Sequence, residues 1–198
     1  DNQMLIRFLM TNNTLNQWVH LTGANEYHIG REVGDLVISD PKCSRKQAVL
    51  KIGEDGGLWL KDLNSSNGTI VNQVKVNEVK LKPNDVVKIG STILLLLEFE
   101  TEMPNTSAKS SVYFTPVDEG GPRAAEAPVK NAIDQTPQQD GSRRIAPLGS
   151  EILQGWPNNL RALPKVALEN FVDHLDNAQR KKSKRLIEIL ESKKKKAS

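Results

Sequence analysis

Short apolar runs separated by turn-forming residues fill the first half of this chain, and their spacing restricts the fold more than any other feature. The runs are rich in Val, Ile and Leu and recur about every 8–12 residues, as short strands do. Gly, Asn, Asp and Pro lie between them, for example in residues 54–57, 67–68 and 82–85. No sustained 3.6-residue period of the kind that marks an amphipathic helix runs through this part. The pattern predicts an all-β sandwich of two twisted, mainly antiparallel sheets.

Composition and motifs exclude several classes of protein. The longest apolar stretch, Ile93 to Leu97, suits a buried strand and is far shorter than the roughly 18 apolar residues of a transmembrane helix, so we expect no membrane partner. Cys43 is the sole cysteine, which excludes an intrachain disulfide and a cysteine-based metal cluster. The chain has no phosphate-cradling glycine-rich loop, HxH motif, CxxC motif or nucleophile–base constellation. We therefore predict no enzyme, no metal and no cofactor.

Charge and proline content divide the chain into three parts. Residues 1–100 carry 11 basic and 12 acidic side chains, residues 101–150 carry 5 and 6, and residues 151–198 carry 11 and 6. The formal net charge of +3 therefore comes from the last quarter. The middle part holds six of the ten prolines and shows no apolar period, which is typical of a flexible segment. We predict a β-domain at 1–102, a disordered Pro-rich linker at 103–150 and a basic helical interaction segment at 151–198.

Two threonines of the predicted linker precede proline. Thr115 and Thr136 are therefore candidate phosphorylation sites for proline-directed kinases. The alternative is that two such dipeptides occur by chance in a Pro-rich segment. A phosphate at either site would add nearly two negative charges to the chain.

The last quarter of the chain carries a helical pattern. Pro164 suits the first turn of a helix, and apolar residues from Val166 to Leu175 fall largely on one face. A basic run interrupts the pattern, and a second amphipathic stretch follows at residues 186–190. So short a segment makes no large core by itself. We therefore predict that residues 164–192 use their apolar stripe to bind a second protein or another copy of the chain.

Basic residues cluster in the same segment. Such clusters are typical of nuclear-localisation signals, and they also neutralise the phosphates of nucleic acids. A solvated helix face is the third interpretation. No aromatic residue interleaves with the charges, so stacking on single strands is not supported. The candidate residues are Arg180, Lys181, Lys182, Lys184 and Arg185, followed by four lysines at 193–196.

Four loop motifs follow one another in the β-rich part. They are Gly30-Arg31, Ser44-Arg45-Lys46-Gln47, the stretch Asp62-Leu63-Asn64-Ser65-Ser66-Asn67-Gly68-Thr69 with Asn72 after it, and Asn84-Asp85-Val86-Val87-Lys88-Ile89-Gly90. In this order and spacing they closely resemble the fork-head-associated (FHA) domain, a β-sandwich that binds phosphothreonine peptides through loops at one end. The resemblance covers residues 4–100, about half of the chain. It implies a phosphothreonine-containing protein as the partner.

The resemblance also implies roles for individual residues. Arginine offers a planar fork of donors, a serine hydroxyl donates a hydrogen bond to phosphate, and an asparagine amide holds a peptide backbone. The implied phosphopeptide contacts are Arg31, Ser44, Arg45, Lys46, Ser66 and Asn67. The implied supports of the loops are Gly30, Gln47, Gly68 and Asn72, where Asn72 is equally a candidate peptide contact. Asp62 is interpreted as a turn former.

One position departs from the family pattern. The pattern reads Ser-Arg-x-His, and this chain has Gln47 where the family's loop-bracing histidine stands. Glutamine both donates and accepts hydrogen bonds without titrating, so we expect binding to survive. The loop Lys42 to Gln47 also resembles that of the FHA domains of polynucleotide kinase-phosphatase and aprataxin, which dock on acidic phosphorylated repair scaffolds.

Other singled-out residues have plain interpretations. We expect His20 and His28 to meet solvent or loop hydrogen bonds, His174 to lie on a helix surface, and Cys43 to be a packed small residue. The sequence thus predicts a phosphothreonine-dependent adaptor, located in the nucleus and acting in the DNA damage response or cell-cycle signalling. The alternatives are a DNA- or chromatin-binding protein that uses its basic tail, or a regulatory fragment of a larger DNA-repair enzyme or kinase.

Overall fold

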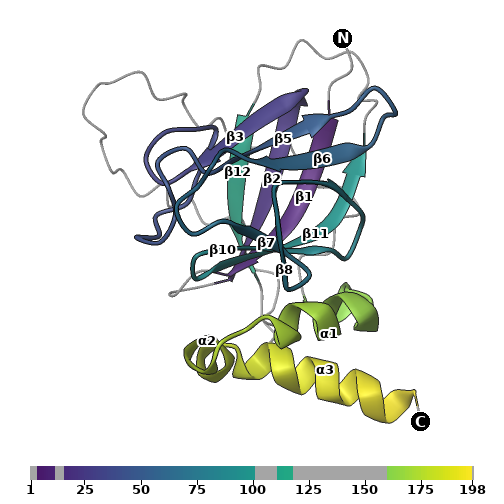
Figure 1. Cartoon of the computed structure of the whole chain (residues 1–198). Helices are drawn as coiled ribbons and strands as arrows, with labels where there is room; N and C mark the ends of the chain where they lie inside the picture. Colours follow the sequence, from purple (N-terminus) through teal and green to yellow (C-terminus); the bar gives the residue numbers. More distant parts are fainter. Residues whose placement is uncertain (1–3, 12–15, 101–110, 118–159, 198) are drawn as a thin grey trace, which may run out of the picture.

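Two β-sheets packed face to face form the N-terminal part of the molecule (Figure 1). The computed structural model describes residues 4–11, 16–100, 111–117 and 160–197. In spatial order, the seven-stranded sheet contains β12 (Ser111–Pro116), β2 (Asn16–Ala24), β1 (Met4–Thr11), β11 (Thr92–Glu100), β10 (Val86–Ile89), β7 (Thr69–Val71) and β8 (Val74–Val76). The five-stranded sheet contains β4 (Leu36–Val37), β3 (Glu26–Gly30), β5 (Ala48–Ile52), β6 (Leu58–Asp62) and β9 (Glu78–Leu81). Neighbouring strands are antiparallel except for β3 and β4, which confirms the predicted sandwich.

The core between the two sheets is made by side chains that alternate along the strands. Phe8 and Tyr27 are among its largest fully buried members, and they come from opposite sheets. Successive side chains of a strand point to opposite faces, so every second residue of the predicted apolar runs reaches this core. Further members are Ile6, Val19, Leu21, Ile29, Leu50, Leu58, Leu60 and Val87.

Strand β11 is apolar on both faces, which explains the longest apolar run of the sequence. Leu94 and Leu96 belong to the core between the sheets. Ile93 and Leu95 alternate with them and belong to a second cluster, on the outer face of the seven-stranded sheet. An uninterrupted apolar run requires cover on both faces of its strand. The outer cover comes from the C-terminal part of the chain.

A helical layer packs against part of the outer face of the seven-stranded sheet and lies below the sandwich in Figure 1. It consists of the 3-10 turn η1 (Leu160–Ala162) and the helices α1 (Lys165–Asp173), α2 (Asn177–Lys182) and α3 (Lys184–Lys196). We call residues 160–196 the helical cap. Its apolar residues Leu168, Phe171 and Leu186 are fully buried. On the sheet they share one cluster with Leu9, Trp18, Val86, Ile93 and Leu95.

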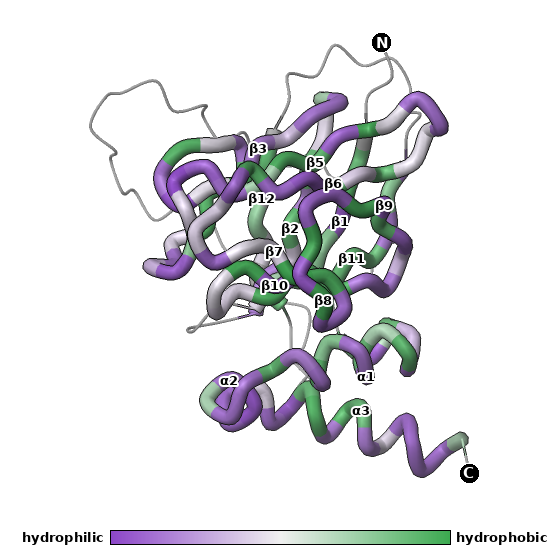
Figure 2. The backbone as a smooth tube through the Cα atoms, in the orientation of Figure 1, coloured by the Kyte–Doolittle hydropathy of each residue, from purple (hydrophilic) through white to green (hydrophobic). Residues whose placement is uncertain are grey.

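The cap changes the interpretation of the C-terminal segment. Helices α1 and α3 form where the apolar period predicts them, with Pro164 as the N-cap of α1, and the short α2 includes part of the basic run predicted to interrupt the pattern. Figure 2 shows apolar stretches in α1 and α3 and a hydrophilic C-terminal end of α3. The apolar stripe predicts a second protein or another copy as its partner, whereas in the structure the chain's own sheet occupies it. Among the described residues, no helix has the length and apolar character needed to cross a membrane.

One strand falls inside the segment interpreted as a linker. Strand β12 pairs antiparallel with β2, and Thr115 lies opposite Trp18. Its sequence is rich in β-branched and aromatic residues, which favour a strand where β2 would otherwise be an open edge. The candidate phosphorylation site Thr115 is thus part of a paired strand, half-buried. Thr136 lies outside the described residues.

Two of the three histidines differ from expectation. His20 is fully buried in β2, although strand alternation places it on the face opposite the core residues Val19 and Leu21. His174 is buried at the end of α1, with its Nδ1 2.6 Å from the carbonyl oxygen of Asn170. His28 is exposed beside Glu26 and Asp35, as expected. Burial, and secondarily the positive charge of Arg7, lowers the pKa of His20 to about 4.

This burial predicts an acid-sensitive contribution to stability. In the unfolded chain His20 takes up a proton near its ordinary pKa of about 6.5, whereas the folded chain excludes the proton until about pH 4. The free energy of unfolding therefore falls as the pH drops from 6.5 to 4, by up to about 3 kcal/mol from this group. Chemical denaturation should show that the stability gap between wild type and His20→Gln narrows over this range. Parallel stability curves for wild type and His20→Gln would contradict the assignment.

Candidate functional site

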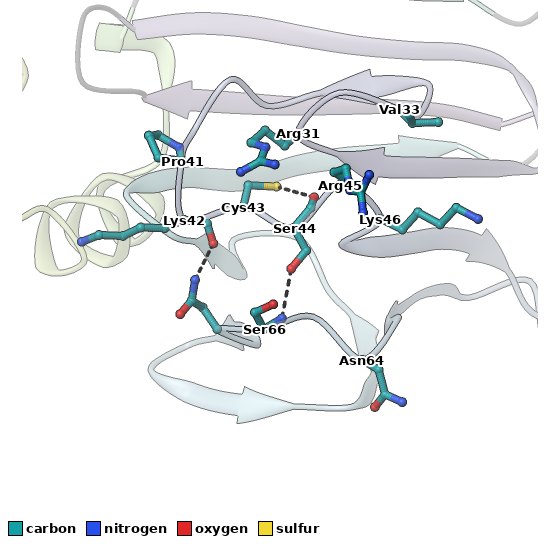
Figure 3. A pocket seen from close by; sticks show the side chains of 11 residues that line it. Arg31, Val33, Pro41, Lys42, Cys43, Ser44, Arg45, Lys46, Asn64 and Ser66 are labelled. Atoms are coloured by element: carbon teal, nitrogen blue, oxygen red, sulfur yellow. Dashed lines mark hydrogen bonds between the residues drawn. The ribbon is translucent and has the colours of Figure 1, made fainter.

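Three loops meet beside the end of β3 and enclose an open pocket of about 640 Å³ (Figure 3). They follow β3, connect β4 to β5, and connect β6 to β7. All six residues predicted to contact a phosphopeptide line this pocket: Arg31, Ser44, Arg45, Lys46, Ser66 and Asn67. Its other lining residues are Val33, Pro41, Lys42, Cys43 and Asn64. The structure thus brings together side chains that are up to 36 positions apart in the sequence, counted from residue 31 to residue 67.

The lining of the pocket is cationic. Arg31, Lys42, Arg45 and Lys46 contribute positive charge, and no acidic side chain stands among the lining residues. Arg31 Nε lies 3.2 Å from a carboxylate oxygen of Glu32, in a pair that is partly open to water on both sides. Such an exposed pair contributes little, so an incoming dianion competes well for this guanidinium.

Two hydrogen bonds join the loops across the pocket. The backbone N–H of Ser66 donates to Ser44 Oγ at 3.0 Å, and Asn67 Nδ2 donates to the carbonyl oxygen of Lys42 at 2.7 Å (Figure 3). The Ser44 hydroxyl keeps its own hydrogen to donate, and the Asn67 amide keeps a second N–H and an oxygen. Both side chains therefore hold the loops while retaining hydrogen-bonding capacity for a ligand.

Gln47 supports the pocket from beneath. It is fully buried, its Oε1 accepts from the backbone N–H of Ser44 at 2.8 Å, and its Nε2 donates to Gly68 O and Thr69 Oγ1 at 3.2 and 3.1 Å. The side chain thereby connects two of the three loops. In this chain a non-titrating amide occupies the position at which the family pattern has a histidine.

Gly30, Gly68 and Asp62 support the loops through close backbone approach and turn geometry. A Cβ atom on Gly30 would lie 2.0 Å from the carbonyl oxygen of Arg45 and 2.2 Å from that of Val33, so only glycine fits. Gly68 adopts φ +83°, a conformation that side chains disfavour. Asp62 stabilises the same turn by accepting from Ser65 N at 2.9 Å and from Thr69 Oγ1 at 2.6 Å, as a turn former does.

Asn72 lies away from the pocket, at the β7–β8 hairpin. Its Oδ1 accepts from Val86 N at 3.0 Å, and its Nδ2 donates to Asp85 Oδ1 at 2.8 Å. By sequence, Asn72 is a candidate both for loop support and for peptide contact. These hydrogen bonds are supporting contacts, and they hold the hairpin against β10. The residue does not line the pocket.

Cys43 lines the pocket as a packed residue. It is buried, and its thiol donates to the carbonyl oxygen of Ser44 with a 3.4 Å separation. Burial, together with the negative charge of Asp40, raises the pKa of the Cys43 thiol to about 11. The thiol is therefore protonated and poorly nucleophilic near neutral pH.

Sequence reasoning missed part of the lining. Val33 and Pro41 carry no motif signal, because loop packing alone brings them to the pocket, and Asn64 lies inside one of the loop motifs but the resemblance implies no contact role for it. The charge of Lys42 is visible in the sequence, but its place on the pocket wall depends on the fold.

The basic residues of the tail do not join this pocket. Arg180 Nε donates to the carbonyl oxygen of Leu175 at 3.1 Å, and Arg185 lines a separate groove on the helical cap. The others of the predicted run, Lys181, Lys182 and Lys184, are exposed on α2 and α3. The groove is also lined by Arg161, Glu188, Ile189, Ser192, Lys193 and Lys196.

The contacts of Gln47 generate a prediction. Gln47→Ala removes three hydrogen bonds and leaves the half-buried N–H of Ser44 without this partner, so the free energy of unfolding should fall by about 3 kcal/mol. Gln47→His, which restores a donor and an acceptor, should recover most of it. Chemical denaturation of the full chain measures both, with Lys46→Ala as an exposed neighbouring control. An alanine variant as stable as the control would show that Gln47 does not hold the loops.

Comparison with known proteins agrees with this geometry. The family model described as the FHA domain matches residues 27–90. The FHA domain of the CT664 protein from Chlamydia trachomatis is 33% identical, over 48% of this chain and 97% of that one, with a TM-score of 0.42. The FHA-2 domain of the Mycobacterium tuberculosis ABC transporter Rv1747 is 38% identical, over 34% of this chain and 63% of that one, with a TM-score of 0.32. A structure from a structural and functional analysis of phosphothreonine-dependent FHA domain interactions is 23% identical, over 48% and 96% of the chains, with a TM-score of 0.41.

FHA domains mediate phosphothreonine-dependent protein interactions and are not catalytic modules. The family model covers the pocket loops from Arg31 to Asn67. On this match, residues 27–90 of the chain belong to the FHA-domain family.

Proposed function

We propose that this chain is a non-enzymatic adaptor that captures a phosphothreonine-containing protein in the pocket between its loops. One observation supports this most directly: the six predicted contact residues line one cationic pocket. A phosphothreonine brings nearly two negative charges and three acceptor oxygens into it. Arg31 faces these oxygens with a bidentate fork, and Ser44 adds a hydroxyl donor. Asn67 holds the peptide backbone.

The proposal predicts a strong effect of Arg31. Arg31→Ala should weaken binding of phosphothreonine peptides by about 3 kcal/mol, or roughly a hundredfold, because a charge-assisted bidentate contact is lost. A phosphothreonine-oriented peptide library selects the probe on the wild-type chain, and calorimetry compares the variants. Lys61→Ala, an exposed charge on β6, is the matched control and should bind like wild type. Equal binding by wild type and Arg31→Ala would overturn the site assignment.

The proposal also includes the chemistry of the partner and the location of the protein in the cell. Lys42 and Lys46 on the pocket wall favour acidic residues near the phosphothreonine. The resemblance of their loop to strand-break-repair FHA domains supports a role in the DNA damage response or in cell-cycle signalling. The basic clusters of the cap support a nuclear location.

A second candidate function is polyanion binding by the groove on the helical cap. Arg161, Arg185, Lys193 and Lys196 line this groove, together with the hydroxyl-bearing Ser192. They come from η1 and α3, so the fold assembles more charge here than one stretch of the sequence suggests. A nucleic-acid backbone presents phosphates of matching chemistry.

Salt dependence tests the second function. If the groove binds DNA, the double variant Arg185→Ala/Lys196→Ala should weaken binding of a 20-base-pair duplex and reduce the slope against salt concentration by about 2. The variant Lys61→Ala/Lys82→Ala removes the same charge from exposed positions of the sandwich and should bind like wild type. Fluorescence anisotropy at several salt concentrations measures both. Equal losses in the two variants would mean that net charge, and not this groove, determines binding.

A further inference from the structure

One buried amide of the helical cap donates a hydrogen bond to the sandwich. Gln179 of α2 is 3% exposed, and its Nε2 donates to the carbonyl oxygen of Ser91 in the β10–β11 turn. Its orientation is fixed within its own helix. Gln179 Oε1 accepts from Asp176 N at 3.0 Å, while Gln179 N donates to Asp176 Oδ1 at 2.8 Å, so the pair forms a capping box. The start of α2 and the β10–β11 turn are therefore locked together.

A buried carboxylate, in the pocket loop between β4 and β5, also holds the β10–β11 turn. Asp40 is 5% exposed, and its Oδ2 accepts from Ser91 N at 2.7 Å and from Thr92 Oγ1 at 3.3 Å. The approach is tight, because a Cβ atom on Gly90 would lie 2.8 Å from the Cβ of Lys42. The β10–β11 turn is thus clamped between the helical cap and the loop that contains Asp40.

From Asp40 the contacts continue into the pocket wall. Asp40 Oδ1 accepts from Lys42 N at 2.8 Å, and the Asp40 carbonyl accepts from Cys43 N at 2.9 Å. The carbonyl of Lys42 accepts from Asn67 Nδ2 at 2.7 Å. Lys42, Cys43 and Asn67 all line the pocket. A continuous series of polar contacts therefore links α2 to the side chain predicted to hold the peptide backbone.

We propose that Gln179 is a positioning residue for the phosphopeptide pocket, acting through Ser91 and Asp40, so that the docked helical cap preorganises residues 40–43. This inference rests on the proposed phosphopeptide binding. Loops that are ordered before binding lose less conformational freedom when the ligand arrives, and affinity rises accordingly. Undocking of α2 removes one of the two sides of the clamp and releases this order.

The same interface supplies a matched control. Asn170 of α1 also ties the cap to the sandwich, since its Nδ2 donates to the carbonyl oxygen of Asn84 at 2.7 Å and lies 3.3 Å from Asn72 Oδ1. Those partners lie in the β9–β10 turn and the β7–β8 hairpin, and neither lines the pocket. Asn170→Ala therefore removes an amide from the cap interface without touching the series through Asp40.

Hydrogen exchange of the full chain without ligand tests the positioning role. In Gln179→Ala, exchange at the amides of Lys42 and Cys43 should accelerate about fivefold, as expected for one lost hydrogen bond, and the NMR signal of the Asn67 side-chain amide should shift. In Asn170→Ala, the exchange rates of Lys42 and Cys43 and the NMR signal of the Asn67 side chain should stay as in wild type. Unchanged exchange in Gln179→Ala, or equal acceleration in both variants, would overturn the proposal.

Binding of the library-selected phosphothreonine peptide should weaken about fivefold in Gln179→Ala and not in Asn170→Ala. If Gln179→Ala releases the whole cap, the variant Asp40→Asn is used in its place. Asp40→Asn leaves α2 intact and should accelerate exchange only at the β10–β11 turn and at residues 40–43. Exchange without ligand tests Gln179 independently of binding. Absence of library binding by the wild type would instead overturn the proposed function.

Discussion

Burial of strand β11 on both of its faces is the constraint on which the rest of the molecule depends. Leu94 and Leu96 fill the space between the sheets, and Ile93 and Leu95 fill the space between sheet and helices. The β10–β11 turn at Ser91 leads directly into this strand, so the element that carries both cores also carries the clamp beside the pocket. Stability of the sandwich, docking of the cap and order of the pocket loop therefore share one strand.

Local patterns predicted the fold class, because apolar alternation along a strand is a short-range rule. The family resemblance, and not periodicity, implied six of the eleven residues that line the pocket. The identity of the element that covers the outer face of β11 could not be predicted. The unbroken apolar run Ile93 to Leu97 indicates only that such a cover is needed. Strand β12 and the burial of His20 and His174 also depend on distant partners, which periodicity does not reveal.

The support beneath the pocket is chemically constant. Gln47 joins the loops with an amide that carries no charge at any pH at which the protein folds, and Cys43 beside it keeps its proton because burial raises its pKa. The cations that face a ligand, such as Arg31 and Arg45, line the pocket above these two uncharged side chains. Support by Gln47 and electrostatic attraction of the ligand therefore reside in different residues, while Ser44 and Asn67 join the loops and also face the ligand.

The order of the elements along the chain has a consequence for synthesis. All strands of the sandwich precede the cap, so a ribosome finishes the sheets while residues 160–196 are still unmade. During that interval Leu9, Trp18, Ile93 and Leu95 form an uncovered apolar surface on a nearly complete domain. Such a surface is prone to aggregation and is a substrate for chaperones. The cap is thus the element that ends this vulnerable stage, and a fragment cut at the sandwich boundary would remain in it permanently.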